Sequence, residues 1–262
     1  MPISHESIGD IWGPNPPRTE DPRLHLVERF FSGTGPSYDA MVHYATFGID
    51  RRWKRQILAL VPPGARRILD LASGTGILTR ALAQYVPFAE IVGVELREEY
   101  LAVARKKQYT TDSGKVSFHL GRAEDFTSEM PFDCVVSSYL AKYAELPRLA
   151  AAAACWLKRG GTFVAHDFTL PPHALLRRIW RLYFSVLQTV GAPILPAWRE
   201  IFYGLPRLIE ETRWVTELPT ALKQEGFQNI RLEYLTLSGS ALLTATAPSR
   251  ATGHQGVKAQ GG

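Results

Sequence analysis

The segment ILDLASGTGILTRAL, residues 68–82, constrains the fold of this chain more than any other. A short apolar run, typical of a buried strand, leads into Gly74 and Gly76, and an amphipathic helical pattern begins at Ile77. Glycines let the backbone approach a ligand where a Cβ atom would collide. The segment therefore predicts a strand, a glycine-rich turn and a helix whose free N–H groups can bind a ligand.

The same alternation of β-branched runs and helical patterns continues along the 262 residues, and it is typical of parallel strands joined by crossover helices. We expect strands at 67–71, 91–96, 115–120, 132–137, 162–167, 230–236 and 241–247, and helices at 77–86, 98–107, 146–157 and 215–225. Only a short turn at Ser238 and Gly239 separates the last two strands, so they form a hairpin. The predicted fold class is α/β: a doubly wound, Rossmann-like seven-stranded sheet, mostly parallel with an antiparallel last strand.

Three further segments complete the predicted organisation. Residues 1–29 are expected to be a loose N-terminal segment and residues 248–262 a disordered tail, because the ends of the chain are rich in Pro, Gly and polar residues. The insertion at 169–214 is too long for an ordinary connection between a strand and a helix, so we expect it to serve a binding site.

Glu95 ends the second predicted strand about 20 residues after Gly76, where an acidic side chain can hold both hydroxyls of a ribose. A dinucleotide site needs a glycine where this chain has Thr79, so no pyrophosphate site is predicted. The acidic segment GRAEDF, residues 121–126, follows the third strand where an adenine edge would lie. A nucleoside that carries methionine instead of phosphate fits this pattern, and the predicted cofactor is S-adenosylmethionine.

Several longer segments carry a resemblance to a known family. They are the loop LDLASGTG, the N-terminal FFSGTGPSYDAM and FGIDRRWKRQIL, the strand segments FDCVVSS and WLKRGGTFVAHDF, and the closing GFQNIRLEYLTLSGSALLTATA. From about Phe30 to Ala247 the chain resembles the methyltransferases of ubiquinone and menaquinone biosynthesis, the UbiE-type family. The resemblance implies an S-adenosylmethionine-dependent methyltransferase with a helical lid over residues 30–60 and a methyltransferase domain over residues 61–247.

The cofactor-binding candidates follow from the loop and from this resemblance. They are Tyr38, Ala72, Ser73, Gly74, Thr75, Gly76, Glu95, Leu96, Arg122, Ala123, Glu124 and Ser138. Arg122 stands where the family usually has Asp or Asn beside the adenine, so Glu124 or Asp125 is the candidate replacement. The ring of Tyr38 is a candidate cation–π partner for the sulfonium.

The acceptor side departs from the family pattern. Val42 and His43 replace its Asn in the lid, and residues 139–143, YLAKY, replace its Phe-Gly-Leu-Arg-Asn run after the fourth strand. The resemblance implies a small, lipophilic acceptor. C-methylation of a demethylated quinol is one hypothesis, and S- or O-methylation of another small thiol or phenol is the alternative.

A sulfonium methyl group is already activated, so the protein mainly aligns the reactants and excludes water. A hydroquinone additionally needs a base that removes its phenolic proton. The candidates near strand ends and in the lid are His43, Lys142, His166 and Asp167, and a plain structural role is the alternative for each.

Other functional classes are less well supported. The net charge of +5 comes from scattered basic pairs, so no nucleic-acid partner is predicted. Methyltransferases that act on nucleic-acid amino groups carry an Asn or Asp, two Pro and an aromatic residue where this chain has SSYLAKY. A protein that binds the cofactor without turnover is a further alternative.

Cys134 and Cys155 match no metal-ligand spacing, and no metal is expected. The first residues, MPISHESIGD, do not resemble a signal peptide, so we expect a cytoplasmic protein. Nothing in the sequence specifies an oligomer.

Within the insertion, ALLRRIWRLYFSVLQTV, residues 174–190, predicts an amphipathic helix. One face carries Leu175, Ile179, Leu182, Tyr183, Val186, Leu187 and Val190, and Arg177, Arg181 and Gln188 lie elsewhere. This helix can cap an apolar acceptor pocket, and its arginines beside Trp180 and Phe184 can rest on an anionic bilayer as a peripheral contact. A lid helix packed wholly on the core is the alternative.

Overall fold

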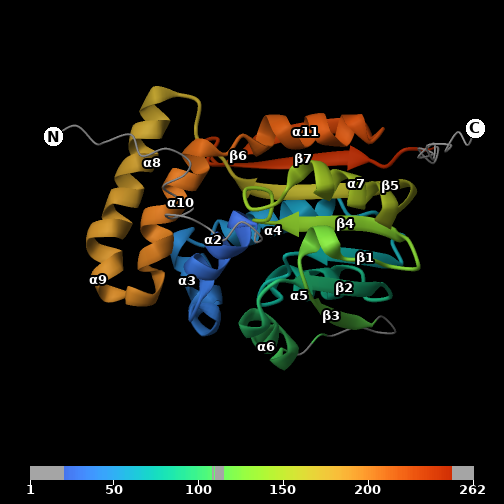
Figure 1. Ribbon diagram of the computed structural model, residues 1–262, viewed down its shortest axis with the longest axis horizontal. Coiled ribbons are helices and arrows are strands. Elements are labelled where there is room, and N and C mark those ends of the chain that lie inside the picture. Colours follow the sequence, from blue (N-terminus) through green and yellow to red (C-terminus); the bar gives the residue numbers. More distant parts are fainter. Residues whose placement is uncertain (1–20, 108, 110–114, 250–262) are drawn as a thin grey trace, which may run out of the picture.

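Seven strands form the centre of the structure, a computed structural model that describes residues 21–107, 109 and 115–249 (Figure 1). The strand order is β3-β2-β1-β4-β5-β7-β6, and β7 runs antiparallel to both of its neighbours while β1 to β5 are parallel. The strands are β1 Arg67–Leu71, β2 Glu90–Glu95, β3 Val116–Leu120, β4 Phe132–Ser138, β5 Leu157–Phe168, β6 Gln228–Leu235 and β7 Ser240–Thr246. The predicted fold class is confirmed.

Helices cover both faces of the sheet, because the central strands are apolar on both sides. α4 (Asp50–Ala59) and α5 (Ile77–Tyr85) pack on one face through residues such as Ile57 and Leu82. α7 (Leu146–Trp156) and α11 (Trp214–Gln224) pack on the other face through Leu149 and Leu218. α6 (Glu98–Lys106) connects β2 to β3.

Most predicted elements agree with the structure to within two residues. The exception is β5, which begins at Leu157 and not at residue 162. Its register against β4 shifts between Phe132 and Cys134, and Gly160 adopts a φ of +70°, which a glycine tolerates. The strand therefore begins before Gly160 and Gly161 and continues through both.

The N-terminal region differs from its prediction, because residues 22–29 belong to α2 (Pro22–Phe31) and are not loose. The Asp21 carboxylate accepts a hydrogen bond from the Arg23 amide at 3.0 Å, and Pro22 suits a first helical turn. Leu26 and Phe30, one turn apart, are buried. Tertiary burial stabilises this short helix, and sequence periodicity does not reveal it. The predicted loose residues 1–20 and the tail from residue 250 lie outside the described residues.

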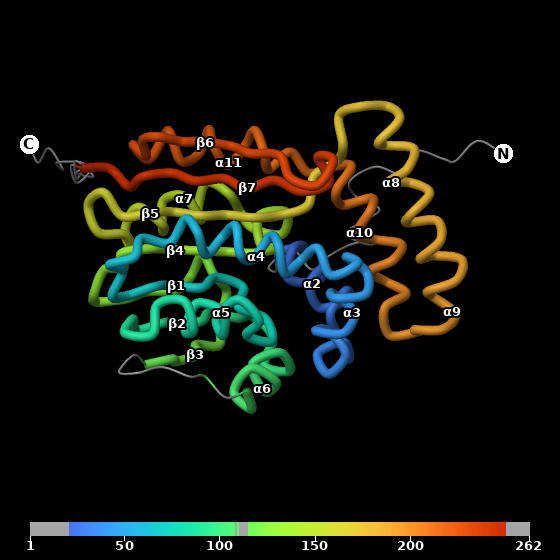
Figure 2. Tube along the Cα trace, turned by 180° about the vertical axis from the view of Figure 1, so that it is seen from behind, coloured from blue at the N-terminus to red at the C-terminus, as the bar shows by residue number. Residues whose placement is uncertain are grey.

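The long insertion folds into helices that meet the N-terminal helices at one end of the sheet (Figure 2). It contains α8 (Ala174–Val186), a π-helical turn (Leu187–Gly191), α9 (Ala192–Ile194), a 3-10 turn (Pro196–Trp198) and α10 (Arg199–Glu211). Another 3-10 turn (Gly35–Ser37) joins α2 to α3 (Tyr38–Ala45). We name α2, α3 and the insertion helices the cap. The core of the cap contains Phe30, Trp198 and Phe202. The cap covers the end of the sheet at which β5 finishes and the chain continues into α8.

The predicted amphipathic helix exists, but its apolar residues occupy two faces instead of one. Tyr183 and Leu187 point inward with Trp180 and Phe184, whereas Leu175, Ile179, Leu182, Val186 and Val190 are exposed. In the part of the chain that the structure describes, no helix is long and apolar enough to cross a membrane.

The contact between α2 and α10 gives a test of the cap. A Cβ atom added to Gly204 would collide with the ring of Phe30. We expect Gly204→Ala to destabilise the protein by about 1–3 kcal/mol, because overpacking forces the two helices apart. Gly64→Ala is the control, since nothing lies within 4 Å of the added atom. Thermal unfolding measures both, and equal melting temperatures for the two variants would contradict this packing.

Candidate active site

The glycine loop after β1 has an unusual backbone. Ala72, Gly74 and Gly76 have φ values of +53°, +58° and +80°. The loop is held from both sides, because the Thr79 hydroxyl in α5 donates to the Asp70 carboxylate in β1 at 2.6 Å. Burial raises the pKa of Asp70 to about 7. The loop is thus shaped by the strand and the helix that it connects.

Glu95, at the end of β2, faces this loop. Its Oε2 accepts a hydrogen bond from the Gly74 amide at 2.8 Å, and its Oε1 accepts one from the Arg97 amide at 2.9 Å. Burial raises the pKa of this carboxyl. Each carboxylate oxygen can accept more than one hydrogen bond, so Glu95 has capacity left for two hydroxyl donors of a ligand.

A cavity lies between the loop, Glu95 and α2, and we name it the loop cavity. Nine predicted cofactor-binding residues line it: Tyr38, Ala72, Gly74, Glu95, Leu96, Arg122, Ala123, Glu124 and Ser138. Ser73, Thr75 and Gly76 do not line it. The Thr75 hydroxyl donates to Asp39 instead, and the Ser73 hydroxyl is buried without a partner among the described residues.

Glu124 and Asp125, the two residues predicted to replace Arg122 beside an adenine, lie in different environments. Arg122 forms ion pairs with Asp21 and Glu124, at 2.6 and 3.1 Å. Glu124 lines the loop cavity, whereas Asp125 is exposed and pairs with Arg148. Of the two candidate replacements beside an adenine, Glu124 is therefore the one at the cavity.

Sequence reasoning missed several residues of the loop cavity. Arg23, Leu24 and Val27 come from α2, and Tyr100 comes from α6. The Tyr100 hydroxyl lies 2.6 Å from the hydroxyl of Thr34, which follows α2. The three α2 residues reach the cavity only because the cap folds over the sheet, so no local sequence signal could identify them.

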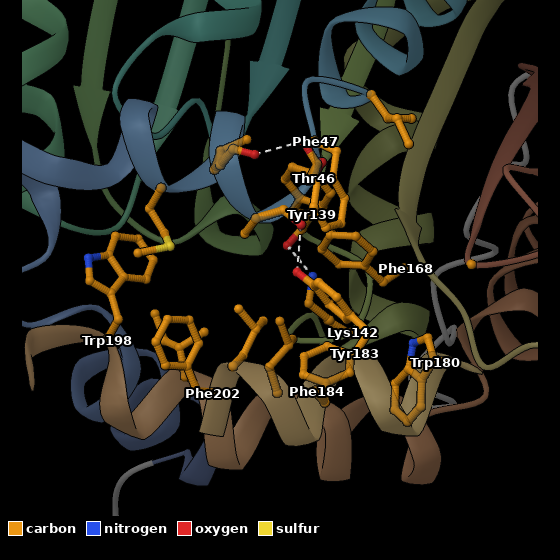
Figure 3. A pocket seen from close by; sticks show the side chains of 18 of the residues that line it. Thr46, Phe47, Tyr139, Lys142, Phe168, Trp180, Tyr183, Phe184, Trp198 and Phe202 are labelled. Carbon is orange, nitrogen blue, oxygen red and sulfur yellow. Dashed lines mark hydrogen bonds between the residues drawn. The ribbon is translucent and has the colours of Figure 1, made fainter. Parts of the chain in front are cut away.

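A second cavity, which we name the aromatic cavity, lies between the sheet end and the insertion. Its aromatic lining residues are Phe31, Tyr38, Phe47, Trp53, Tyr139, Tyr143, Phe168, Trp180, Tyr183, Phe184, Trp198 and Phe202. Figure 3 shows the rings of Trp180, Tyr183, Phe184 and Phe202 across the cavity from Tyr139 and Phe168. The cavity suits an apolar ligand with a flat ring.

Lys142 brings a positive charge into the lining of the aromatic cavity. Its Nζ lies 2.5 Å from Asp167 Oδ1, and both side chains are buried. The same Nζ lies 4.7 to 5.5 Å from the ring centres of Tyr139, Tyr143 and Phe168. Burial lowers the pKa of Lys142, and Asp167 opposes this shift. Lys142 is thus a desolvated cation in the wall of an apolar cavity.

Tyr139 occupies a strained backbone position directly after β4, with a φ of +71°. Its hydroxyl donates to Asp50 Oδ1 at 2.6 Å, and Lys54 donates to the same oxygen at 2.6 Å. Its ring stacks on Phe168 with centroids 4.8 Å apart. These contacts hold a residue in a conformation that non-glycine residues rarely adopt, which is common at ligand sites.

The two predicted histidines line neither cavity. His166 is buried beside Trp53 and Tyr139, with its Nδ1 3.3 Å from the Ser138 hydroxyl. Burial lowers its pKa well below the usual value, so the imidazole is neutral. His43 is exposed on α3. Asp167 does not line the aromatic cavity either, and it reaches it only through its contact with Lys142. Of the four candidates, the structure brings only Lys142 to the acceptor side.

The two cavities share part of their walls. Phe31, Tyr38, Tyr139 and Tyr143 line both of them. The two cavities are therefore neighbours bordered by the same four rings. Transfer of a group between two bound molecules requires such proximity.

The polar groups of the loop cavity fit a nucleoside, because a buried carboxylate with acceptor capacity faces a turn whose glycine backbone leaves room for a ligand. Such a cavity, beside a second, apolar cavity at one end of a β3-β2-β1-β4-β5-β7-β6 sheet, defines a class I S-adenosylmethionine-dependent methyltransferase. The ubiE/COQ5 methyltransferase family model matches residues 19–246, and this chain belongs to that family.

Characterised relatives support the assignment. Demethylmenaquinone methyltransferase of Thermus thermophilus is 30% identical over 224 residues, which are 83% of this chain and 100% of the relative. The ubiquinone/menaquinone biosynthesis C-methyltransferase UbiE of Syntrophotalea carbinolica is 29% identical, with 79% and 87% of the two chains covered.

Solved structures share the fold. The plantazolicin methyltransferase BpumL in complex with S-adenosylhomocysteine has a TM-score of 0.57 at 13% identity, with 86% of this chain and 95% of that chain covered. A methyltransferase of Thermotoga maritima has a TM-score of 0.56 at 16% identity, with 87% and 100% covered.

Glu95 gives a test of the loop cavity. We expect Glu95→Ala to weaken S-adenosylmethionine binding by about 2 kcal/mol, roughly 30-fold, because ribose hydroxyls would lose a charged acceptor. Isothermal titration calorimetry measures the affinity. Glu90→Ala, at the other end of β2, is the matched control and should bind like the parent. Unchanged affinity in Glu95→Ala would remove this residue from the binding site.

Proposed function

We propose that this enzyme transfers a methyl group from S-adenosylmethionine to a ring carbon of a demethylated quinol. The aromatic cavity is the observation that supports this most, because stacked and edge-on rings surround a space next to the loop cavity and enclose the Lys142 ammonium. A flat, apolar ring with a phenolic oxygen complements that lining. Relatives named demethylmenaquinone methyltransferase support the same acceptor class.

In this proposal the loop cavity holds the cofactor, which supplies a methyl group activated by a positively charged sulfur. Glu95 would accept hydrogen bonds from the ribose hydroxyls, and Ala123 and Glu124 would border the adenine. Tyr38 lines both cavities, so its ring is available to a sulfonium as a cation–π partner.

The acceptor ring would lie against Tyr139 and Phe168, whose parallel rings already stack on each other at 4.8 Å. The aromatic side chains of the insertion close the opposite side (Figure 3). Such a lining excludes water from the reacting carbon and limits the orientations of a flat ring.

Lys142 is the residue that we assign to the phenolic oxygen. A nearby positive charge lowers the pKa of a phenol and favours the phenolate, in which the ortho carbon is nucleophilic. Asp167 holds the Lys142 ammonium in place and is a positioning residue. In the overall reaction the acceptor's C–H bond is replaced by a C–CH3 bond, the sulfur becomes a neutral thioether, and one proton is released. His43 and His166 have no part in this proposal.

A survey of acceptors tests the proposed function directly. The purified protein would be incubated with labelled S-adenosylmethionine and with reduced demethylated naphthoquinols, demethylated benzoquinols, simple phenols and thiols. We expect label on a ring carbon of a quinol, located by fragmentation of the product in a mass spectrometer. The oxidised quinones are the control and should not react, because they have no phenolic proton to lose.

Two results of the survey would contradict the proposal. Label on the oxygen of a phenol or the sulfur of a thiol, with no quinol product, would make this chain an O- or S-methyltransferase. Binding of the cofactor with no methylated product from any acceptor class would leave a cofactor-binding protein.

Substitution of Lys142 tests its proposed role at the phenolic oxygen. We expect Lys142→Met to lower kcat about 100-fold or more without changing cofactor affinity, because the phenolate loses its counter-charge. Removing one partner of a buried ion pair can also unfold a protein, so the double variant Lys142→Met with Asp167→Asn is tested as well. Lys158→Met, an exposed lysine paired with Asp133, is the matched control. A folded double variant with the parent's kcat would exclude this role.

A further inference from the structure

The outward face of the insertion is an exposed aliphatic stripe. It consists of Leu175, Ile179, Leu182, Val186, Val190 and Ile194, and each is between 50% and 69% exposed. Spacings of three and four residues place them along one side of α8 and its continuation. We name this set the outer stripe.

The outer stripe has no role in the core. The inward side of the same helix is formed by Trp180, Tyr183, Phe184 and Leu187, which line the aromatic cavity. Single exposed apolar residues are common on proteins, but a row of six branched aliphatic side chains marks an interaction surface.

Beside α8, the aromatic cavity has one strongly exposed lining residue among the described residues. Phe47, 78% exposed in the turn between α3 and α4, lies 6.0 Å from Tyr183, centroid to centroid. The Tyr183 hydroxyl donates to the Ala45 carbonyl, which fixes α8 beside this turn. Phe47 and Tyr183 both line the cavity, and Figures 1 and 2 place α8 at the outer end of the molecule.

The charged residues of the segment that carries the outer stripe are all arginines. Residues 168–199 contain four arginines and neither Asp nor Glu. Arg177 donates to the Pro171 carbonyl and Arg181 pairs with Glu210, so these two stabilise the cap. Arg178 is exposed, and no acidic side chain in the part of the chain that the structure describes pairs with it.

Two further cations follow the exposed Phe47. Arg51 and Arg52 are exposed in the first turn of α4 and have no acidic partner within residues 21–107, 109 and 115–249. Apolar side chains flanked by free arginines are the pattern of a helix that lies in the interface of an anionic bilayer.

We propose that the outer stripe, with Phe47 and the flanking arginines, docks the protein on an anionic lipid bilayer. α8 then lies parallel to the membrane plane, with its aliphatic side chains among the upper acyl chains and Arg178 at the headgroups. Phe47, the exposed residue of the cavity lining, also contacts the lipid in this orientation. The delivery of acceptor from lipid to the cavity rests on the function proposed above, whereas the docking itself does not.

Charge favours lipid over a second copy of this chain. A symmetric dimer would bring the same cationic surface of two molecules together. An anionic bilayer instead pairs these arginines with phosphate groups and attracts the protein from solution.

Vesicle co-sedimentation tests the docking. The probe is large unilamellar vesicles of phosphatidylcholine with about one third phosphatidylglycerol, compared with pure phosphatidylcholine. We expect the parent to bind the anionic vesicles, more weakly at high salt. The stripe variant carries the three changes Ile179→Glu, Leu182→Glu and Val186→Glu. Its affinity for the anionic vesicles should be at least about tenfold lower, because it adds negative charge to the membrane face.

The matched control carries the same number of apolar-to-acidic changes far from the cap. Tyr85→Glu, Phe88→Glu and Met130→Glu change exposed side chains near the starts of β2 and β4, at the opposite end of the sheet. This control should bind vesicles nearly like the parent, apart from its added charge. Arg178→Glu should keep the fold and lose part of the salt-sensitive binding, because Arg51 and Arg52 remain.

The outcomes separate docking from catalysis. Equal vesicle binding by the stripe variant and the control would overturn the proposal. A parent protein that does not bind anionic vesicles at low salt would also overturn it. If the parent is then a dimer in solution and the stripe variant is a monomer, the surface is an interface between two copies of this chain. A parent that binds vesicles but methylates no quinol would retain the docking and refute the proposed function. A stripe variant that keeps activity on a short-chain quinol and loses it on a vesicle-embedded one supports both.

Discussion

The hydrogen bond from the Gly74 amide to the Glu95 carboxylate joins the turn after β1 to the end of β2, and the loop cavity is built on this junction. It anchors the turn on one side, while Thr79 and Asp70 anchor it on the other. Because side chains of the sheet and of α5 fix the loop, its shape does not need a ligand. Binding then costs less conformational entropy than it would for a free glycine turn.

The wall between the cavities is aromatic and comes from both parts of the molecule. Tyr139 and Tyr143 follow β4, whereas Phe31 and Tyr38 belong to the cap. The cap therefore completes the aromatic cavity as well as covering it. Trp198 ties the same region together, since its indole N–H donates to the Ser37 hydroxyl and its ring stacks on Tyr38.

The sheet and glycine loop were predictable, because strand patterns, turn glycines and the position of Glu95 are local signals. The cap was less predictable. α2 depends on burial of Leu26 and Phe30 by residues far along the chain, and Trp198 and Phe202 reach the aromatic cavity only through tertiary folding. Periodicity also could not divide the apolar residues of α8 into an inner and an outer set. Both sets repeat at helical spacing, and only the neighbouring elements distinguish them.

The π-helical turn at Leu187–Gly191 has a geometric consequence for that outer set. In an α-helix, residues spaced four apart drift around the axis by about 40° per step, because each residue turns about 100°. In a regular α-helix, the steps from Val186 to Val190 and Ile194 would therefore rotate the end of the outer stripe away from its beginning. A π-turn rotates less per residue and so cancels much of this drift. The π-helical turn thus keeps Val190 and Ile194 on the same side of the helix as the start of the outer stripe.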